Sequence, residues 1–337
     1  MSQDANPILV EITRGALVES LHRGAAAVVD HRGVLHAAWG DIARRVYARS
    51  ALKPLQALPL IESGAADHFG LGAVEIALAC ASHSGEPGHV NAVKQWLSRI
   101  GLDAGALECG VHLPYHDHTA AHLLRSGGAP SALHNNCSGK HAGFLSSAVY
   151  LGENPRGYIH ADHPRQQQVR RTLEEMSDTT LGDAPTGIDG CGIPVIGLSL
   201  RATAYAMARL AEPQHLPPAR AQACRRIVAA MANQPWMVAG SGRFGTAVMD
   251  VIGNKAIIKI GAEGVFTAAL PGLGLGIALK IDDGAARAAI AIGALIDHLG
   301  VLTEAQRRTL ADILEPPVYN RAGLIVGRMR RRRSWLQ

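Results

Sequence analysis

The stretch KAIIKIGAEGVFTAALPGLGLGIALKIDD, residues 255–283, consists of three aliphatic segments separated by glycines and one proline. Short apolar segments rich in β-branched residues are typical of strands, and turns of this length connect antiparallel neighbours. The segment before it, TAVMDVIG at residues 246–253, fits one more strand of the same kind. We therefore expect an antiparallel meander in the C-terminal part of the chain.

The first forty residues carry the same signal, in ILVEITRG (8–15), GAAAVVD (24–30) and VLHAAWGD (34–41). From residue 49 to about 232 the apolar residues recur instead at helical spacing, and a last helix is expected at 285–300. The order of strands, helices, strands and helix predicts a mixed α/β fold of the α+β type. Its N- and C-terminal strands would share one antiparallel sheet covered by helices, and a helical middle region would lie between them in the chain.

We expect a single domain of two lobes. The sheet lobe takes in residues of about 1–48 and 233–327, the mainly helical middle about 49–232, and a basic tail residues 328–337. Five arginines in this tail account for the whole formal net charge of +5. Because the tail has one aromatic residue, Trp335, and no nucleic-acid-binding module around it, a solvated or frayed tail is favoured over a nucleic-acid site.

The bulk composition is typical of a compact globular protein with a large core, since 47% of the 337 residues are hydrophobic and 18% are charged. No run approaches the roughly 18 apolar residues of a membrane span. The N-terminal MSQDANPILVEI also lacks a basic segment followed by an apolar one, so we expect a cytoplasmic protein that binds no membrane. Five cysteines, an odd number, favour free thiols or metal ligands over a disulfide framework.

RSALKPLQ, residues 49–56, places Ser50 and Lys53 one helical turn apart. Side chains at i and i+3 share a helix face, so this pair offers a nucleophile and a base. A lysine acts as a base only after losing its proton, which burial or a neighbouring cation such as Arg49 favours. Alternatively, Ser50 only caps a helix whose leucines pack inward. S-x-x-K is common by chance, so the motif alone favours the helix-cap interpretation.

Three further loops combine glycines with polar side chains: ASHSGEPGHV (81–90), HNNCSGKHAGF (134–144) and GIDGCGIPV (187–195). The last two contain Cys137 and Cys191. Two cysteines from separate loops provide half of a zinc site, because thiolates bind zinc strongly. With no C-x-x-C pair and no H-E-x-x-H motif, however, spacing alone favours two buried thiols or a reversible disulfide.

Lys259 and Gly261 form a K-x-G motif on one of the expected C-terminal strands. Serine acyl-transfer enzymes of the β-lactamase and penicillin-binding type place such a lysine beside their S-x-x-K helix, and the glycine leaves room for substrate. The order of S-x-x-K, polar loops and K-x-G strengthens the catalytic interpretation of Ser50 and Lys53. Residues 81–84 do not match the S-D-N motif of those enzymes, and no acidic deacylation loop is recognisable.

Together, RSALKPLQALPL, SHSGEPGHV, HNNCSGKHAGFL and GIDGCGIPV resemble the L-asparaginase II family, the Rhizobium-type or class 3 asparaginases. The resemblance spans most of the chain and implies a β-lactamase-like or glutaminase-like fold. It also implies an amidohydrolase that acts on the side-chain amide of L-asparagine, and a homodimer. It assigns two Ser-Lys tandems, Ser50 with Lys53 and Ser82 with a late lysine, which is Lys259 or, alternatively, Lys280.

The same resemblance implies a zinc ion bound by Cys137, Lys140 and Cys191. A lysine ligand is unusual because its ammonium has to lose a proton first. The residues expected to contact substrate are Arg49, Asn136, His141 and Asp189. Asp189 would hold the α-ammonium group and Arg49 the α-carboxylate.

Several alternatives stay open at this level. Ser50 is the expected nucleophile, but the two serines can exchange roles, and zinc can either orient the substrate or activate water directly. A preference for asparagine over glutamine depends on one methylene, worth about 1–3 kcal/mol in a pocket. A glutaminase, a penicillin-recognising serine hydrolase and a non-catalytic zinc-containing binding protein are the rival functions.

Overall fold

The computed structural model of the chain describes residues 5–284 and 287–336. Their contacts define two compact units. Unit 1 takes in the described residues of 1–51, 198–212 and 247–337, and unit 2 takes in residues 52–197 and 213–246. Residues 198–212, which the sequence analysis assigns to the helical middle, therefore belong with the terminal segments.

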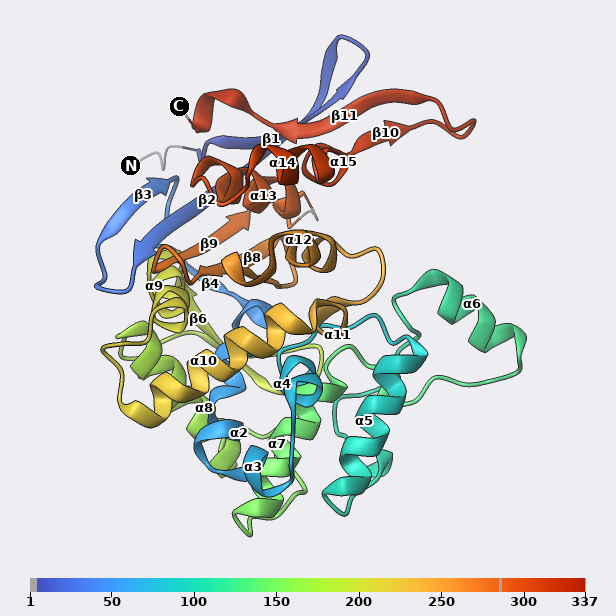
Figure 1. Ribbon diagram of the computed structural model, residues 1–337, viewed down its shortest axis with the longest axis vertical. Coiled ribbons are helices and arrows are strands. Elements are labelled where there is room, and N and C mark those ends of the chain that lie inside the picture. The colour runs from blue at the N-terminus through green and yellow to red at the C-terminus, as the bar shows by residue number, and fades with distance from the viewer. Residues whose placement is uncertain (1–4, 285–286, 337) are drawn as a thin grey trace. The chain divides into compact units, whose positions relative to one another are not determined.

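An antiparallel sheet forms the centre of unit 1. Its eight strands among the described residues are β1 (Ile8–Arg14), β2 (Leu17–Asp30), β3 (Leu35–Trp39), β7 (Ile257–Ile260), β8 (Val265–Leu270), β9 (Leu275–Ile281), β10 (Pro317–Tyr319) and β11 (Ile325–Arg331). Their order is β10-β11-β1-β2-β9-β8-β7, with β3 paired to β2 beside this path. The N- and C-terminal strands share one sheet (Figure 1), which confirms the α+β class predicted from the element order.

The long strand β2 joins the two ends of the chain. Residues 17–23 pair with β1, whereas residues 24–30 pair with β9 of the C-terminal meander. The meander itself, β7 to β9, runs through antiparallel neighbours as its short turns predict. The stretch 255–283 therefore completes a sheet that the N-terminal strands begin.

Helices cover both faces of this sheet. Helix α9 (Leu200–Ala211) packs on β2, β8 and β9, where Ala25, Ala27 and Ala204 share one buried cluster. The alternate residue Ala26 points to the opposite face and is also fully buried. A side chain at Gly276 would place its Cβ 2.0 Å from the Ala204 carbonyl oxygen, so this glycine permits the close approach of α9.

The remaining elements of unit 1 are short. They are β4 (Arg45–Tyr47), η1 (Arg49–Leu52), α12 (Phe244–Ile252), η4 (Gly253–Lys255), α13 (Ala288–His298), α14 (Glu304–Thr309), α15 (Ala311–Leu314) and η5 (Arg333–Trp335), where η denotes a 3-10 helix and η1 and α12 cross the unit boundary. Helix α13 contacts β8 and β9 and lies within the span 285–300 expected to be helical.

TAVMDVIG, residues 246–253, is not the strand that its composition suggests, because residues 246–252 lie in α12 and Gly253 begins η4. Val248, Met249 and Ile252 are buried, and their spacing of one and four residues defines one face of a helix. β-Branched residues raise strand propensity only weakly, and tertiary packing overrides that preference. The prediction of a fourth strand in the meander was wrong for this reason.

The basic segment at the C-terminal end is not a frayed tail. Its first arginines lie in β11, which pairs with both β1 and β10. Arg330 and Arg332 donate hydrogen bonds of 2.8 Å and 2.7 Å to the buried carboxylate of Glu11 in β1. A buried carboxylate on the neighbouring strand therefore anchors this segment. The expectation of a frayed tail was wrong, although Arg328, Arg330 and Arg333 are exposed to solvent.

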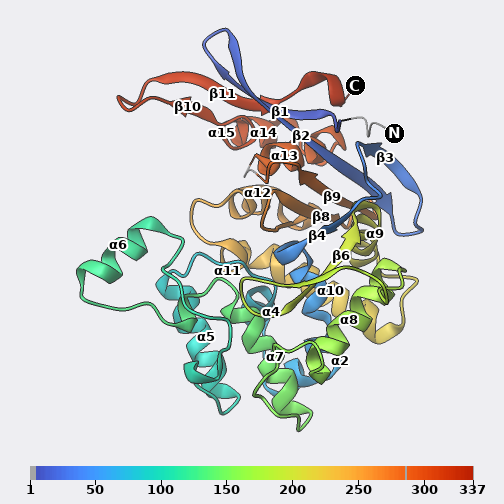
Figure 2. The same ribbon diagram turned by 180° about the vertical axis from the view of Figure 1, so that it is seen from behind.

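Unit 2 is mainly helical. Its elements are α1 (Lys53–Gln56), α2 (Leu58–Glu62), α3 (Ala65–His68), α4 (Ala73–Ala79), α5 (Pro87–Arg99), η2 (Ala104–Ala106), α6 (Asp117–Arg125), η3 (Ala132–His134), α7 (Ser138–Tyr150), α8 (Pro164–Ser177), α10 (Pro218–Asn233) and α11 (Pro235–Ala239), with a hairpin of β5 (Thr186–Ile188) and β6 (Pro194–Ser199), whose last two residues belong to unit 1. Helix α7 is almost entirely buried and contacts α2, α4, α5 and α8 (Figure 2). Across the described residues, no helix has the length and apolar character needed to span a membrane.

Candidate active site

Lys53 is the centre of a buried polar cluster in unit 2. Its side chain has no solvent exposure, and its amine donates to Ser82 Oγ at 3.0 Å, to the Ala81 carbonyl oxygen and, at 3.5 Å, to the Asn136 carbonyl oxygen. Proline follows the lysine because position 54 lies in the first turn of α1, where a missing N–H removes no helical hydrogen bond. The structure thus brings together Lys53 and two of the three polar loops predicted to form a site.

Backbone contacts on two sides hold the Ser82 loop. The Ser82 N–H donates to the Val238 carbonyl at 2.9 Å, and the His83 N–H donates to the Asn136 carbonyl at 3.3 Å. The Ser84 hydroxyl adds a bond of 2.8 Å to the Ala239 carbonyl. The serine next to Lys53 is therefore fixed by neighbours from two other segments of unit 2.

His83 is a structural support of this loop. Its Nδ1 accepts from the Gly85 N–H at 3.2 Å, so Nε2 carries the proton and donates to Ser138 Oγ at 2.9 Å. Burial, then the proximity of His89 and Lys53, holds the pKa of His83 well below its ordinary value. Because both nitrogens of this neutral imidazole are already hydrogen-bonded, His83 acts as a support for the loop that carries Ser82.

Ser50 lies in η1, directly before α1, and is partly exposed. The sequence prediction of a helical turn at this place is confirmed, although the turn is a 3-10 helix. Arg49 has a positive φ of 53°, a backbone conformation that is uncommon outside glycine and recurs at functional sites. The boundary between the units follows Ala51, so Ser50 belongs to unit 1 and Lys53 to unit 2.

Lys259 lies in β7 opposite Thr267 of β8, and its side chain is 1% exposed. Its amine donates to the Ile260 carbonyl at 2.8 Å. Thr267 Oγ1 donates to the Ala51 carbonyl at 3.0 Å, so the turn that carries Ser50 rests on this pair of strands within unit 1. A Cβ at Gly261 would lie 2.4 Å from the Ala48 carbonyl oxygen. The glycine of K-x-G therefore makes room for the backbone before Ser50, where the sequence analysis expected it to make room for substrate.

Lys280, the alternative late lysine, lies in β9 and is less buried. Its amine donates to the carbonyls of Glu263 and Ile281, both at 2.6 Å. Burial and then the Arg44 charge lower the pKa of Lys280, although Asp282, Glu263 and Asp283 oppose that shift. Lys280 is thus more exposed than Lys259 and lies near the end of its strand. Lys259 is therefore the better candidate for the late lysine.

The three expected zinc ligands lie together in unit 2. Cys137 and Lys140, three residues apart at the start of α7, share a helix face, and Cys191 comes from the turn between β5 and β6. Lys140 Nζ lies 2.9 Å from Cys191 Sγ, and the two cysteine side chains are hydrogen-bonded. All three are at most 4% exposed. Asp189 Oδ2 lies 3.8 Å from Cys191 Sγ at the edge of the cluster.

The charges of this cluster favour a Cys137 thiolate beside a protonated Lys140. Burial alone would lower the pKa of Lys140, but the charges of Cys137, Cys191 and Asp189 outweigh it and raise that pKa. The hydrogen bond between the thiols lowers the pKa of Cys137 and raises that of Cys191. Two sulfurs and one nitrogen converge, which fits three positions of a tetrahedral zinc site once the amine and second thiol release their protons. Within residues 5–284 and 287–336, no group of three or more His, Cys, Asp or Glu could hold a metal, so a site here depends on the lysine.

His141 has an unpaired nitrogen in this region. The Tyr158 hydroxyl accepts from the Glu108 N–H at 2.9 Å and donates to His141 Nδ1 at 2.6 Å, which assigns the imidazole proton to Nε2. That Nε2 is buried and has no hydrogen-bond partner in the described structure. Burial, then Lys140 and Lys53, keeps the pKa of His141 well below its ordinary value. The residue is therefore a neutral N–H donor that lacks an acceptor, as expected of a group that contacts a ligand.

The family model of L-asparaginase II matches residues 10–331 of the chain. The chain belongs to the L-asparaginase II family. Membership of this family supports an amidohydrolase, and it agrees with the resemblance that the four sequence motifs carry.

No curated protein matches this L-asparaginase II family chain. Among solved structures, it is similar to Mglu in its native form at 13% identity and a TM-score of 0.48, over 84% of this chain and 66% of the Mglu chain. The chain thus spans just under two thirds of the length of Mglu. It is also similar to a β-lactamase from Mycobacterium bovis at 17% identity and a TM-score of 0.38, over 86% of this chain and 95% of that one.

Sequence reasoning missed three residues around the candidate site of this L-asparaginase II family chain: Tyr158, His89 and Trp236. Tyr158 fixes His141, and the imidazole of His89 stacks between His83 at 4.9 Å and Trp236 at 4.0 Å. Tyr158 stands alone in GYIH without a recognisable motif, and Trp236 follows a proline far from the Ser82 loop in the chain. Only His89 carried a signal, because it belongs to the polar stretch 81–90, although the structure places it in α5.

Proposed function

We propose that the chain hydrolyses L-asparagine to L-aspartate and ammonia by acyl transfer through a serine and a lysine, beside a zinc site. The observation that carries this proposal is the buried contact of 3.0 Å between Lys53 Nζ and Ser82 Oγ. A buried lysine bonded to a serine is the arrangement that activates a hydroxyl nucleophile. Membership of the L-asparaginase II family supports the amide substrate.

In the proposed reaction, a serine oxygen attacks the side-chain amide carbon, and the neutral amine of Lys53 accepts the serine proton. The tetrahedral intermediate collapses, its C–N bond breaks, and the leaving nitrogen takes a proton to depart as ammonia. Water then attacks the acyl-serine ester and releases aspartate. Ser50 is the proposed nucleophile, on the S-x-x-K motif, with Ser82 and Lys259 passing protons. The contact of Lys53 with Ser82 supports the alternative, in which the two serines exchange roles.

Substrate recognition follows from the charges of the remaining residues. Asp189 would bind the α-ammonium group, and Arg49 the α-carboxylate. The unpaired Nε2–H of His141 would donate to a substrate oxygen. Asn136 lies at the site through its backbone, since its carbonyl accepts from Lys53.

Zinc would be held by Cys137, Lys140 and Cys191, whose convergence fits the metal. When bound, it would supply a fixed positive charge that orients the polar groups of the substrate. Chelation tests this role. A rise in KM with residual turnover and an intact fold agrees with orientation, whereas complete loss of turnover with an intact fold agrees with direct activation of water.

The experiment that tests the proposed function measures ammonia release from L-asparagine and L-glutamine by the zinc-loaded chain. Ser50→Ala and Ser82→Ala are compared with Ser98→Ala, an exposed serine of α5. We expect release from asparagine, near-complete loss in Ser50→Ala, and no change in the control. Mass spectrometry of quenched reactions identifies the acylated serine. Acylation of Ser82 in place of Ser50 reverses the assignment of the serines.

Release from neither amide by folded, zinc-loaded protein contradicts the proposed function. Thermal stabilisation by asparagine without turnover would then indicate a binding protein. Covalent labelling by a β-lactam would instead indicate a penicillin-recognising hydrolase. A homodimer is also part of the proposal, and sedimentation of the same preparation measures it.

A further inference from the structure

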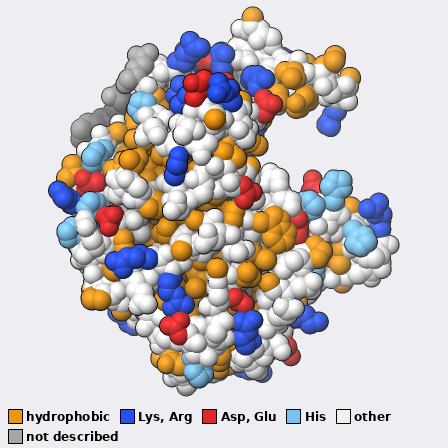
Figure 3. Space-filling view, in the orientation of Figure 1, with side chains coloured by type: hydrophobic (Ala, Val, Ile, Leu, Met, Phe, Trp, Pro, Cys, Tyr) orange, Lys and Arg blue, Asp and Glu red, His pale blue; other side chains and the backbone are white. Residues whose placement is uncertain are grey.

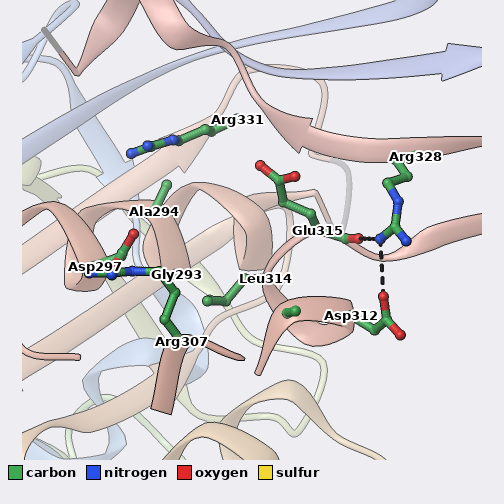
Figure 4. Close-up of a pocket in the computed structure, with 10 residues that line it drawn as sticks. Gly293, Ala294, Asp297, Arg307, Asp312, Leu314, Glu315, Arg328 and Arg331 are labelled. Carbon is green, nitrogen blue, oxygen red and sulfur yellow. Dashed lines mark hydrogen bonds and ion pairs between the residues drawn. The ribbon is translucent and has the colours of Figure 1, made fainter. Parts of the chain in front are cut away.

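A cavity lies entirely within unit 1. It has a volume of about 450 Å³ and is bounded by α13, α14, α15 and β11 (Figure 4). This volume falls in the range of about 300–1,000 Å³ that small-molecule sites occupy. Gly293, Ala294 and Leu314 provide a small apolar surface, and the other lining side chains are mostly charged. The cavity contains none of the residues assigned to the acyl-transfer site.

Two ion pairs account for part of this charge. Arg307 Nε lies 2.7 Å from Asp297 Oδ1, and Arg328 Nη1 lies 3.0 Å from Asp312 Oδ1. In the space-filling view, basic and acidic side chains are mixed over the region of α14 and α15 (Figure 3). These four residues therefore neutralise one another and leave no charge for a ligand.

Arg331 and Glu315 are the remaining charged groups of the lining. Within the described part of the chain, neither side chain has a hydrogen bond or an ion pair. Figure 4 shows the Arg331 side chain extended over the cavity and the Glu315 carboxylate directed toward its interior, with no bond between them. Both residues are partly buried, so each loses some hydration without gaining a protein partner. The cavity thus offers one unpaired guanidinium and one unpaired carboxylate.

We propose that this cavity binds a free α-amino acid. Its carboxylate would accept the paired N–H groups of Arg331, its ammonium would donate to Glu315, and a small side chain would contact Ala294 and Leu314. A simple anion would leave Glu315 facing a like charge, and a simple cation would do the same to Arg331. A zwitterion pairs with both side chains and leaves the lining neutral. The ligand should therefore carry both an ammonium and a carboxylate group.

The inference stands apart from the proposed asparagine hydrolysis, because it uses only the geometry and charges of unit 1. Calorimetric titration of the zinc-loaded, full-length chain with L-alanine tests it. L-Alanine has a side chain of the right size and no side-chain amide to hydrolyse. N-Acetyl-L-alanine lacks the ammonium group, and L-alaninamide lacks the carboxylate.

We expect L-alanine to bind and both derivatives to bind at least about tenfold more weakly, since each loses a charge-assisted contact. Arg331→Gln and Glu315→Gln should each weaken the binding of L-alanine by a similar factor. Arg333→Gln, an exposed arginine outside the cavity lining, should leave binding unchanged. Asp189→Asn, in the acyl-transfer site, should also leave it unchanged, which separates the two sites.

Three outcomes overturn the proposal. Absence of binding by L-alanine, L-serine and L-leucine alike means that the cavity has no amino-acid ligand. Binding that Asp189→Asn abolishes and Arg331→Gln leaves intact belongs to the other site. If Arg331→Gln or Glu315→Gln instead converts an oligomer into a smaller species on sedimentation, the cavity is a contact between copies of this chain.

Discussion

The two units bury their polar side chains in different ways. In unit 2, Lys53, Ser82, His83 and Ser138 form one continuous network in which each residue is bonded to another member or to the backbone beside it. In unit 1, Glu11 and Thr267 are separate polar groups in an aliphatic core, each bonded at its own place. Buried polar networks gain rigidity at the expense of apolar packing.

This difference indicates that unit 2, which holds the network, is where the chain gives up stability for function. Replacing Glu11 of unit 1 should change stability and not turnover, because its carboxylate pairs with Arg330 and Arg332, which are not part of the proposed site. Replacing a member of the network should change turnover far more than stability, as expected where a preorganised site trades stability for activity. The three variants below test that separation.

The largest effect is expected for Lys53→Met, which keeps the length of the side chain and removes the amine. Loss of the general base should lower kcat for asparagine by about 10²–10⁴-fold. The Ala81 carbonyl loses its donor, so the free energy of unfolding should fall by no more than about 3 kcal/mol. Stopped-flow ammonia assays and urea unfolding measure the two quantities.

Lys94→Met, an exposed lysine of α5, is the matched control and should change neither quantity. A Lys53→Met protein that keeps more than about a tenth of wild-type turnover is incompatible with a base role for this residue. A variant that unfolds at once would show that the network of unit 2 stabilises the fold as well as the site.

An intermediate effect is expected for Tyr158→Phe. Without the hydroxyl, His141 Nδ1 loses its donor, and the proton is no longer confined to Nε2. Loss of a partner that orients a ligand-binding group typically lowers activity by about 10–100-fold. We expect kcat/KM to fall in that range, and the ¹⁵N shifts of His141 to report a mixture of tautomers.

Tyr319→Phe, at an exposed tyrosine of β10, is the control for the substitution itself. If Tyr158→Phe keeps both the tautomer and wild-type kcat/KM, the Tyr158 hydroxyl is only a structural group. Loss of stability alone, through the unpaired Glu108 N–H, would lead to the same conclusion.

Much of the fold could be predicted from the sequence, because the signals that carry it are local. Alternating and helical periods located β1, β3, α5 and α13 from a few neighbouring residues. TAVMDVIG failed as a strand because its side chains fit a helix face only in the packed core. The C-terminal arginines failed as a tail because their partner, Glu11, is 319 and 321 residues away in the chain.

For the site, too, local patterns could be recognised in the sequence and long-range contacts could not. Loops rich in glycine and polar residues pointed to Ser82, Cys137 and Cys191, because such composition is a local signal of a special backbone. The sequence analysis paired Ser82 with a late lysine, whereas the contact between Lys53 and Ser82 depends on how α1 meets the Ser82 loop in three dimensions. Tyr158 was missed because a single tyrosine has no pattern of its own.

The smallest effect on activity is expected for Glu11→Gln in unit 1. Burial would raise the pKa of Glu11, but the hydrogen bonds from Arg332 and Arg330 outweigh it and lower that pKa below its ordinary value of 4.5. A lowered carboxyl pKa stabilises the fold above pH 4.5, and this contribution is lost as the pH falls from 4.5 through the lowered pKa.

Both arginines are about half exposed, so Glu11→Gln should lower the free energy of unfolding by about 1–2 kcal/mol at pH 7 and leave kcat unchanged. Glu19→Gln is the control and should change little, because the Glu19 carboxylate that pairs with Arg14 is 42% exposed, whereas that of Glu11 is 6% exposed. A loss of stability in Glu11→Gln that is undiminished at pH 3 would contradict the ion-pair explanation. A lower kcat would mean that Glu11 and its two arginines are coupled to the proposed site.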